Sequence, residues 1–181
     1  MMKTALEGFF RRLQAFSQSK FGTFPTVCFT DELNRDLIVS APDEDGEVQW
    51  KPVLQKTSVD WKNMEDRLGF RLCPELKEYY SIWSFPVLTG KFGNSTLTFY
   101  GINALEGVEK TVLQEYTDAQ YVFPNSQIFL LGNAVIHDQD DWFIYFDNKT
   151  QKVFCYESDT GKEVLLAYSL AGLFDRMEAS I

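Results

Sequence analysis

The chain has 181 residues, the length of one ordinary domain, and its 45% hydrophobic and 24% charged residues are typical of a globular protein. Seventeen basic residues against 26 acidic ones give a net charge of -9, which argues against a nucleic-acid or anionic-lipid partner and favours a basic one. No apolar stretch reaches the roughly 18–20 residues of a membrane span, and Lys3, Arg11 and Arg12 interrupt the segment where a signal peptide needs an apolar run. We therefore expect a single cytoplasmic domain over residues 1–181.

The N-terminal segment predicts a helix at about 4–20. Thr4 and Glu7 have the spacing of a capping box, and Gly22 with Pro25 marks the end of the segment. The apolar residues form one helical stripe of Leu6, Phe9, Phe10, Leu13 and Phe16. Beyond Pro25 the pattern is irregular as far as Pro52, with an acidic turn at 43–47 that leads into a short strand-like alternation at 48–50.

Two short helices are expected next. Asp60 is placed to cap the first, which ends at Gly69, and Pro74 starts the second. The apolar face of the second helix consists of Leu76, Tyr79, Tyr80 and Trp83. After Pro86 the alternation at 95–100 predicts a strand, and residues 105–116 return to a helical pattern through Leu105, Val108, Val112 and Leu113.

The last third carries the clearest sheet signal. Ser169 is placed to cap a final helix that carries Leu170, Leu173, Phe174 and Met177. Before it come apolar-rich runs separated by turn residues, at 127–131, 142–146, 153–156 and 164–167, with a hairpin at 147–150. This order of elements predicts an α+β fold in which a mostly antiparallel, twisted sheet is covered by helices.

Catalytic and metal-binding patterns are scarce. The single histidine, His137, is the only imidazole base for a serine or cysteine nucleophile, and it lies in a loop, which favours an ordinary turn residue. The sequence contains no GxSxG, HExxH, P-loop or GxGxxG pattern. Asp138, Asp140 and Asp141 share one loop that lacks the central glycine and distal glutamate of a calcium loop. Cys28, Cys73 and Cys155 lack the spacing of a zinc site or a disulfide framework. We expect no cofactor or metal, and an enzyme is the least favoured class.

Charge and aromatic residues favour a protein-binding surface instead. Residues 1–90 carry 11 basic and 13 acidic residues (-2), whereas residues 91–181 carry 6 and 13 (-7), so the C-terminal half is the more electronegative. An acidic surface there is expected to attract cationic loops, with aromatic anchors supplying specificity. The residues predicted to bind the partner are Asp138, Asp140, Asp141, Asp43, Glu44 and Glu47, with Trp83 and Trp142 as anchors.

The order and spacing of several segments also resemble a known family. They are the opening 5–10 helix, the 48–52 segment, 63–65 and 72–80, then 146–153 and the 167–174 helix. The chain resembles the Syd family within the SUKH superfamily. Syd resemblance implies a non-enzymatic protein, peripheral to the inner membrane, whose acidic surface docks on basic cytoplasmic loops of the SecY translocation channel. SUKH resemblance implies an alternative, an immunity protein that binds and neutralises a cognate toxin.

Overall fold

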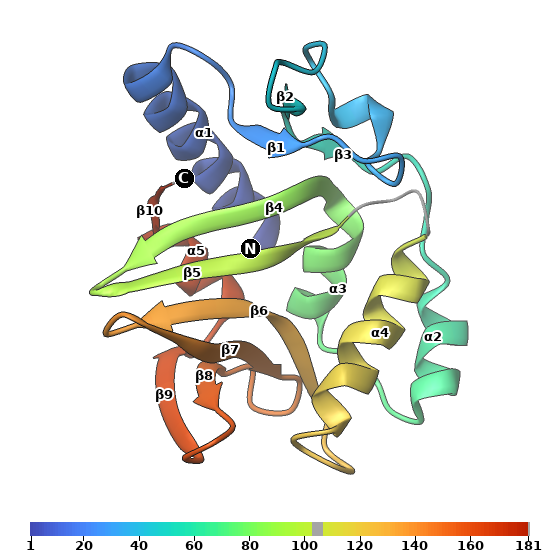
Figure 1. Ribbon diagram of the computed structural model, residues 1–181. Helices are drawn as coiled ribbons and strands as arrows, with labels where there is room; N and C mark the ends of the chain where they lie inside the picture. Colours follow the sequence, from blue (N-terminus) through green and yellow to red (C-terminus); the bar gives the residue numbers. More distant parts are fainter. Residues whose placement is uncertain (103–106, 181) are drawn as a thin grey trace.

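An eight-stranded antiparallel sheet forms the centre of the protein (Figure 1). The structure, a computed structural model, describes residues 1–102 and 107–180. The strand order is β10-β4-β5-β6-β7-β8-β9, and β3 pairs with β4 beside this path. The strands are β3 (Val53–Leu54), β4 (Trp83–Phe92), β5 (Ser95–Ile102), β6 (Ile128–Ile136), β7 (Gln139–Asp147), β8 (Val153–Glu157), β9 (Lys162–Ala167) and β10 (Glu178–Ala179). A separate two-stranded sheet pairs β1 (Thr26–Cys28) with β2 (Glu47–Gln49).

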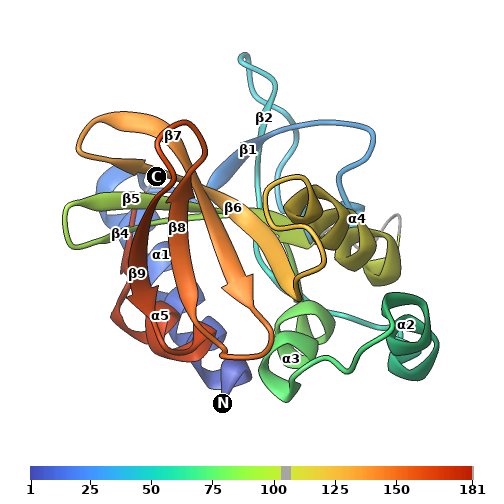
Figure 2. The same cartoon turned by 90° about the horizontal axis from the view of Figure 1, so that it is seen from below.

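Helices cover one face of the large sheet. Helices α1 (Met2–Phe21) and α5 (Leu170–Arg176) lie behind the sheet in Figure 1 and below it in Figure 2. Helix α3 (Pro74–Ile82) joins them in the core, while α4 (Val108–Gln120) packs beside β6. Helix α2 (Trp61–Leu68) and the 3-10 helix η1 (Arg35–Leu37) complete the described fold. The predicted α+β class, with a mostly antiparallel sheet covered by helices, is confirmed.

The core lies between the sheet and the α1, α3 and α5 layer. The ring of Phe174 on α5 occupies its centre, with centroids 5.6 Å from Phe9, 6.2 Å from Tyr79 and 4.8 Å from Phe99. All four rings are 1% exposed or less. Burial of this much apolar surface is the main stabilising contribution to the fold. In the described part of the chain, no helix combines the length and the hydropathy that a membrane-spanning segment needs.

Most predicted helix ends are confirmed by their capping geometry. The Asp60 carboxylate accepts a hydrogen bond from the Asn63 amide at 3.1 Å, and the Ser169 hydroxyl accepts one from the Gly172 amide at 3.0 Å. Gly69 ends α2 in the left-handed conformation, at φ 78°. The capping box predicted at Thr4 was wrong, because α1 begins at Met2 and Thr4 lies within its first turn.

Strand β4 was not predicted, and its sequence explains why. It contains Pro86, which lacks an amide hydrogen and is rarely found in a central strand. The register places Pro86 opposite Gly101, and a Cβ atom at Gly101 would approach the Pro86 carbonyl oxygen to 1.8 Å. The missing side chain therefore allows the two backbones to come together. Trp83, predicted on the apolar face of the preceding helix, is instead the first residue of β4.

The remaining elements follow the predicted order with shifted ends. The helix predicted at 105–116 is α4, which starts at Val108, and Leu105 lies outside the described residues. Strand β6 runs on to Ile136, with register shifts against β7. Met177, predicted inside the last helix, is the residue that follows α5 and is 1% exposed.

Candidate binding face

The face of the sheet that points away from the main core is paved with aromatic side chains. Because strand residues alternate between faces, the pairing register defines one continuous cross-strand row on this side. The row runs from β5 to β9 through Thr98, Asn133, Phe143, Tyr156 and Glu163. A second row runs beside it through Leu130, Tyr145, Phe154 and Leu165.

The aromatic residues of these rows pack on one another. We call Phe143, Tyr145, Phe154 and Tyr156, together with Phe123 from the α4–β6 connection, the aromatic face. The Phe123 ring lies 4.9 Å from both Tyr145 and Tyr156 in edge-to-face geometry, and Tyr145 stacks on Phe154 at 5.8 Å. Tyr145 and Phe154 are buried under this layer, whereas Phe143 and Tyr156 are half-buried and reach the surface. The face is therefore rigid below and available for contact above.

Burial keeps the deepest phenol of this face in its neutral form. The pKa of Tyr145 is raised to about 12, mainly by burial and with smaller contributions from the nearby Tyr100, Tyr156 and Asp118. Asp118 on α4 also contributes to the raised pKa of Tyr100, after burial and Glu115. A carboxylate thus lies close to the α4 side of the aromatic face.

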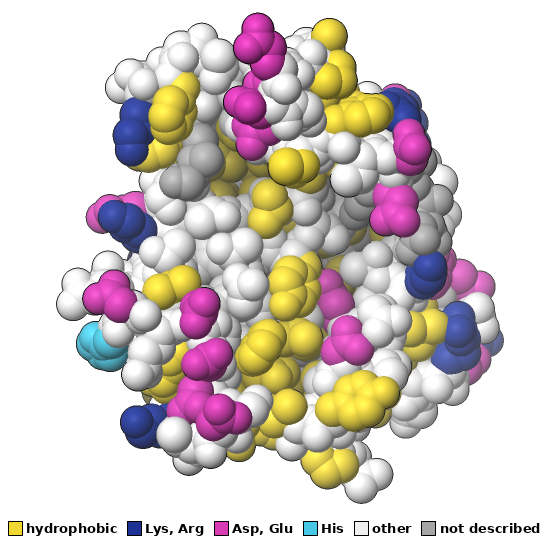
Figure 3. All heavy atoms as spheres, in the orientation of Figure 1, with side chains coloured by type: hydrophobic (Ala, Val, Ile, Leu, Met, Phe, Trp, Pro, Cys, Tyr) yellow, Lys and Arg dark blue, Asp and Glu magenta, His cyan; other side chains and the backbone are white. Residues whose placement is uncertain are grey.

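Acidic side chains gather where two hairpins meet at the other side of this face. Cross-strand pairing of Trp142 with Glu157, and of Glu157 with Lys162, brings the start of β7 beside the β8–β9 turn. All of the gathered carboxylates are exposed, and we call them the acidic end: Asp138, Asp140, Asp141, Asp159 and Glu163. Figure 3 shows hydrophobic side chains down the middle of this view with acidic ones on both sides.

The acidic end carries little compensating charge. Lys162 is the single basic residue in 138–141 and 157–163, and none of the ion pairs found among the described residues involves the five carboxylates. Glu157, in the same region, is occupied by its own turn, where it accepts hydrogen bonds from the amides of Asp159 and Thr160. Exposed carboxylates without cationic partners form a surface that attracts positive charge.

The three predicted loop aspartates are brought together around the turn between β6 and β7 and the start of β7. Asp138 belongs, with His137, to the two-residue turn between β6 and β7, where both residues have positive φ angles of 61° and 51°. Asp140 and Asp141 follow in β7, at the register shift where both lie opposite the single residue between Ala134 and Ile136. Among the described residues, no group of histidine, cysteine, aspartate or glutamate side chains is arranged to hold a metal ion.

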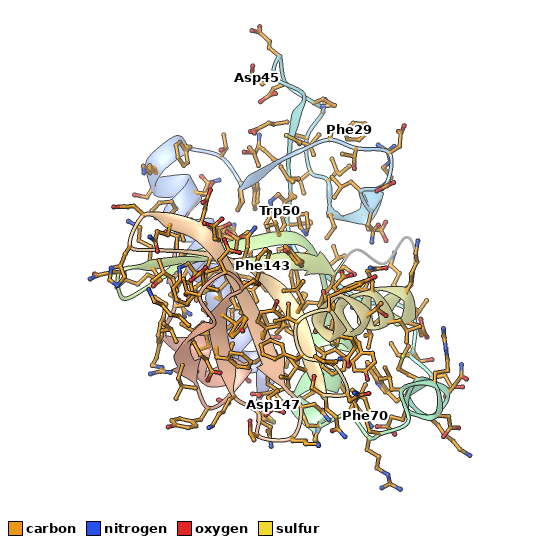
Figure 4. The ribbon with its side chains drawn as sticks, turned by 60° about the horizontal axis from the view of Figure 1, so that its bottom comes forward. Phe29, Asp45, Trp50, Phe70, Phe143 and Asp147 are labelled. Carbon is orange, nitrogen blue, oxygen red and sulfur yellow. The ribbon has the colours of Figure 1, made fainter. Side chains whose placement is uncertain are left out.

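The predicted acidic turn at 43–47 lies elsewhere. Figure 4 shows Asp45 at the tip of the segment before β2, well away from Phe143 on the sheet. Asp43 holds this turn together, because its carboxylate accepts hydrogen bonds from the amides of Asp45 and Glu47 at 3.0 and 2.8 Å. Glu44 is exposed and Glu47 is half-buried. The structure does not join these residues to the acidic end.

The two predicted tryptophan anchors have different surroundings, and neither lies on the aromatic face. Trp142 is 5% exposed and belongs to the main core, where its ring offers little surface to a partner, and its anchoring role stays a prediction. Trp83 is half-buried and packs edge-to-face on Phe10, with ring centroids 5.5 Å apart. Neighbouring residues on a strand face opposite sides, so Phe143 lies where Trp142 was expected. The pattern of residues 142–146 predicts a strand whose side chains point to two faces of a sheet, but it does not indicate which face the helices cover.

A pocket of about 540 Å³ lies beside Trp83, between α1 and the segment around Trp50. Phe10 and Leu13 supply an apolar wall, and its other lining includes Glu7, Arg11 and Lys51. These charges have both signs, so the pocket selects neither a cation nor an anion by charge alone. The aromatic face and the acidic end together form the more clearly defined binding surface.

Comparisons with known proteins agree with one another. A family model described as Syd protein (SUKH-2) matches residues 3–110. Protein Syd of Shewanella pealeana is 25% identical over 142 residues, which cover 77% of this chain and 60% of that protein. Protein Syd of Pseudoalteromonas atlantica is 21% identical over 160 residues (86% and 79%), and that of Shewanella halifaxensis is 24% identical over 159 (87% and 68%). The chain belongs to the Syd family.

Proposed function

We propose that this member of the Syd family is a non-enzymatic binding module, acting as one domain over residues 1–181, that docks on a basic protein segment. The partner we infer is a positively charged cytoplasmic loop of the SecY translocation channel, so the protein would work at the cytoplasmic face of the inner membrane through that contact. The observation that carries the proposal is the position of five exposed carboxylates at the border of an aromatic face.

The acidic end and the aromatic face would contribute to binding in different ways. Attraction between exposed charges is screened within about 8 Å at physiological salt, so the acidic end speeds and orients the encounter. Affinity then depends on apolar contact that removes water, for which Phe143 and Tyr156 offer half-buried rings. The family match ends at residue 110, before both sets, so their role rests on geometry and charge.

The proposal is tested with synthetic peptides that span each basic cytoplasmic loop of SecY. Binding is measured by calorimetry at low and high salt for the natural protein and for Asp141→Lys. We expect the substitution to weaken the tightest peptide roughly tenfold, as loss of a charged contact followed by repulsion does, and to flatten the salt dependence. Circular dichroism checks that the variant is folded.

Glu44→Lys is the matched control, because it changes the net charge by the same amount on an exposed residue of the separate acidic turn. An affinity within about twofold of the natural protein is expected for it, since a distant rim charge acts mainly through long-range steering. An equal loss in both variants would show that net charge alone, or both acidic regions, drive binding. An unchanged affinity in Asp141→Lys would remove the acidic end from the interface.

The identity of the partner is tested separately by using the protein as bait for detergent-solubilised membranes and for secreted fractions of the source cells. Recovery of SecY that is lost at raised salt supports the proposal. Recovery of a toxin in a salt-resistant complex would replace the proposed function with the alternative that SUKH resemblance implies, an immunity protein.

A further inference from the structure

The outer edge of β9 has no strand beside it. The sheet path ends at this strand, and no hydrogen bond found among the described residues reaches its outer side. In an edge strand every second residue turns its backbone N–H and C=O groups outward, where another chain can pair with them. The pairing of β9 with β8 is regular over Lys162–Leu165 and shifts beyond it, towards Ala167.

This edge is also apolar and weakly protected. Val164 is 38% exposed and Leu165 is 42% exposed, and Tyr168, just beyond the strand, is 72% exposed. Natural proteins usually block such edges with proline or several charges, but β9 contains no proline, and its two charges, Lys162 and Glu163, lie at its first two positions. Helix α5 packs near β9 from the core side and leaves these side chains accessible. The edge is therefore competent for strand addition.

The side chains of β9 place this edge within the proposed interface. Glu163 ends the cross-strand row that contains Phe143 and Tyr156, and Leu165 ends the row that contains Tyr145 and Phe154. A strand added at β9 would extend both rows by one position. Its residue beside Glu163 would meet the acidic end, and its residue beside Leu165 would continue the aromatic face.

We propose that the partner's basic segment binds in extended form, as an added strand along the outer edge of β9. The inference rests on the proposed function and specifies how that function is carried out. A segment with alternating basic and apolar residues fits best, because Glu163 and Leu165 are two positions apart and share one side of the sheet. Charge disfavours a second copy at this edge, since each copy carries a net charge of -9.

The test uses the SecY loop peptide that binds tightest in the calorimetry described above, and two N-methylated forms of it. One form carries backbone methyl groups on alternate residues and the other carries them on the residues between. In an added strand only every second amide hydrogen bonds to β9. The form that is methylated at those residues is therefore expected to lose affinity at least tenfold, whereas the affinity of the other form stays within about threefold of that of the parent peptide. Equal binding by both forms, or equal loss in both, would overturn strand addition.

The protein side gives an independent readout by amide hydrogen exchange in NMR. The outward amides among Lys162–Leu165 are expected to exchange at least tenfold more slowly when the peptide is bound, whereas the inward ones are already protected by β8. Unchanged exchange would overturn the inference even if the parent peptide still binds in an Asp141-dependent way, which would leave the proposed function intact. Failure of the parent peptide to bind would overturn both. Protection in the free protein, together with a dimer in sedimentation, would assign the edge to a second copy instead.

Discussion

The buried carboxyl of Glu115 is expected to make the stability of this protein depend on pH. Glu115 lies on the inner side of α4, is 6% exposed, and accepts a hydrogen bond from the hydroxyl of Tyr80 on α3. Burial raises the pKa of Glu115 to about 8 and outweighs the opposing effect of the Tyr80 hydrogen bond, and the nearby Asp118 makes a smaller raising contribution. At pH 7 the folded protein therefore holds a proton at Glu115 that the unfolded chain has released.

The sign and size of the effect follow from proton linkage. A carboxyl whose pKa is raised on folding contributes stability that is fully present below its unfolded value of about 4.3 and is lost as the pH rises towards 8. Each pH unit within this window changes the unfolding free energy by up to about 1.4 kcal/mol. Between pH 5 and pH 7 the natural protein should thus lose on the order of 2–3 kcal/mol relative to Glu115→Gln, which cannot ionise.

The assay is urea unfolding of the natural protein and Glu115→Gln at pH 5, 6, 7 and 8, because the difference between the two cancels the titration of all other groups. Glu109→Gln, on the same helix and half-buried, controls for general effects of a glutamine on α4. Tyr80→Phe removes the hydrogen bond that lowers the pKa of Glu115 and should extend the pH dependence to higher pH. If the difference in unfolding free energy between the natural protein and Glu115→Gln stays constant between pH 5 and pH 7, the inference that Glu115 is buried and protonated would be refuted.

Two glycine substitutions should change stability in opposite directions. Gly101→Ala is expected to destabilise the protein by more than about 3 kcal/mol, measured by thermal unfolding, because its Cβ would lie 1.8 Å from the Pro86 carbonyl oxygen; a small effect would contradict the β4–β5 register. Gly8→Ala should stabilise α1 by roughly 0.5–1 kcal/mol in the same assay, since its Cβ meets only the Arg12 guanidinium, at an ordinary contact distance of 3.4 Å; destabilisation would show that the helix packs more tightly there.

The elements that could be predicted are those whose signals lie close together in the chain. The caps at Asp60 and Ser169 are local hydrogen bonds within three residues, and the alternation in β7 and β8 spans a few positions. Strand β4 was not predicted because a proline within it is tolerated only through its pairing with Gly101, which is fifteen positions after Pro86. The compensation becomes visible only when the two strands are paired.

The same distinction applies to the candidate site. The carboxylates at 138–141 are adjacent in sequence and could be recognised as a cluster, whereas Asp159 and Glu163 join them only through the β7–β8 and β8–β9 pairing. The cluster at 43–47 looked equivalent in sequence, yet Asp43 is committed to hydrogen bonds within its own turn. Acidic turns can be predicted from local composition, whereas the turn that borders the aromatic face is known only from the pairing of the strands.

The proposed binding role gives a reason for the acidic end that folding does not supply. Like charges held close together repel and reduce the stability of the folded state, and Lys162 is the single cation that these two hairpin ends supply. None of the five carboxylates caps a helix of the described chain. A cationic segment seated beside Glu163 would relieve this repulsion and cover Phe143 and Tyr156 at the same time. The arrangement that is unfavourable in the isolated protein is thus the one that favours a basic partner.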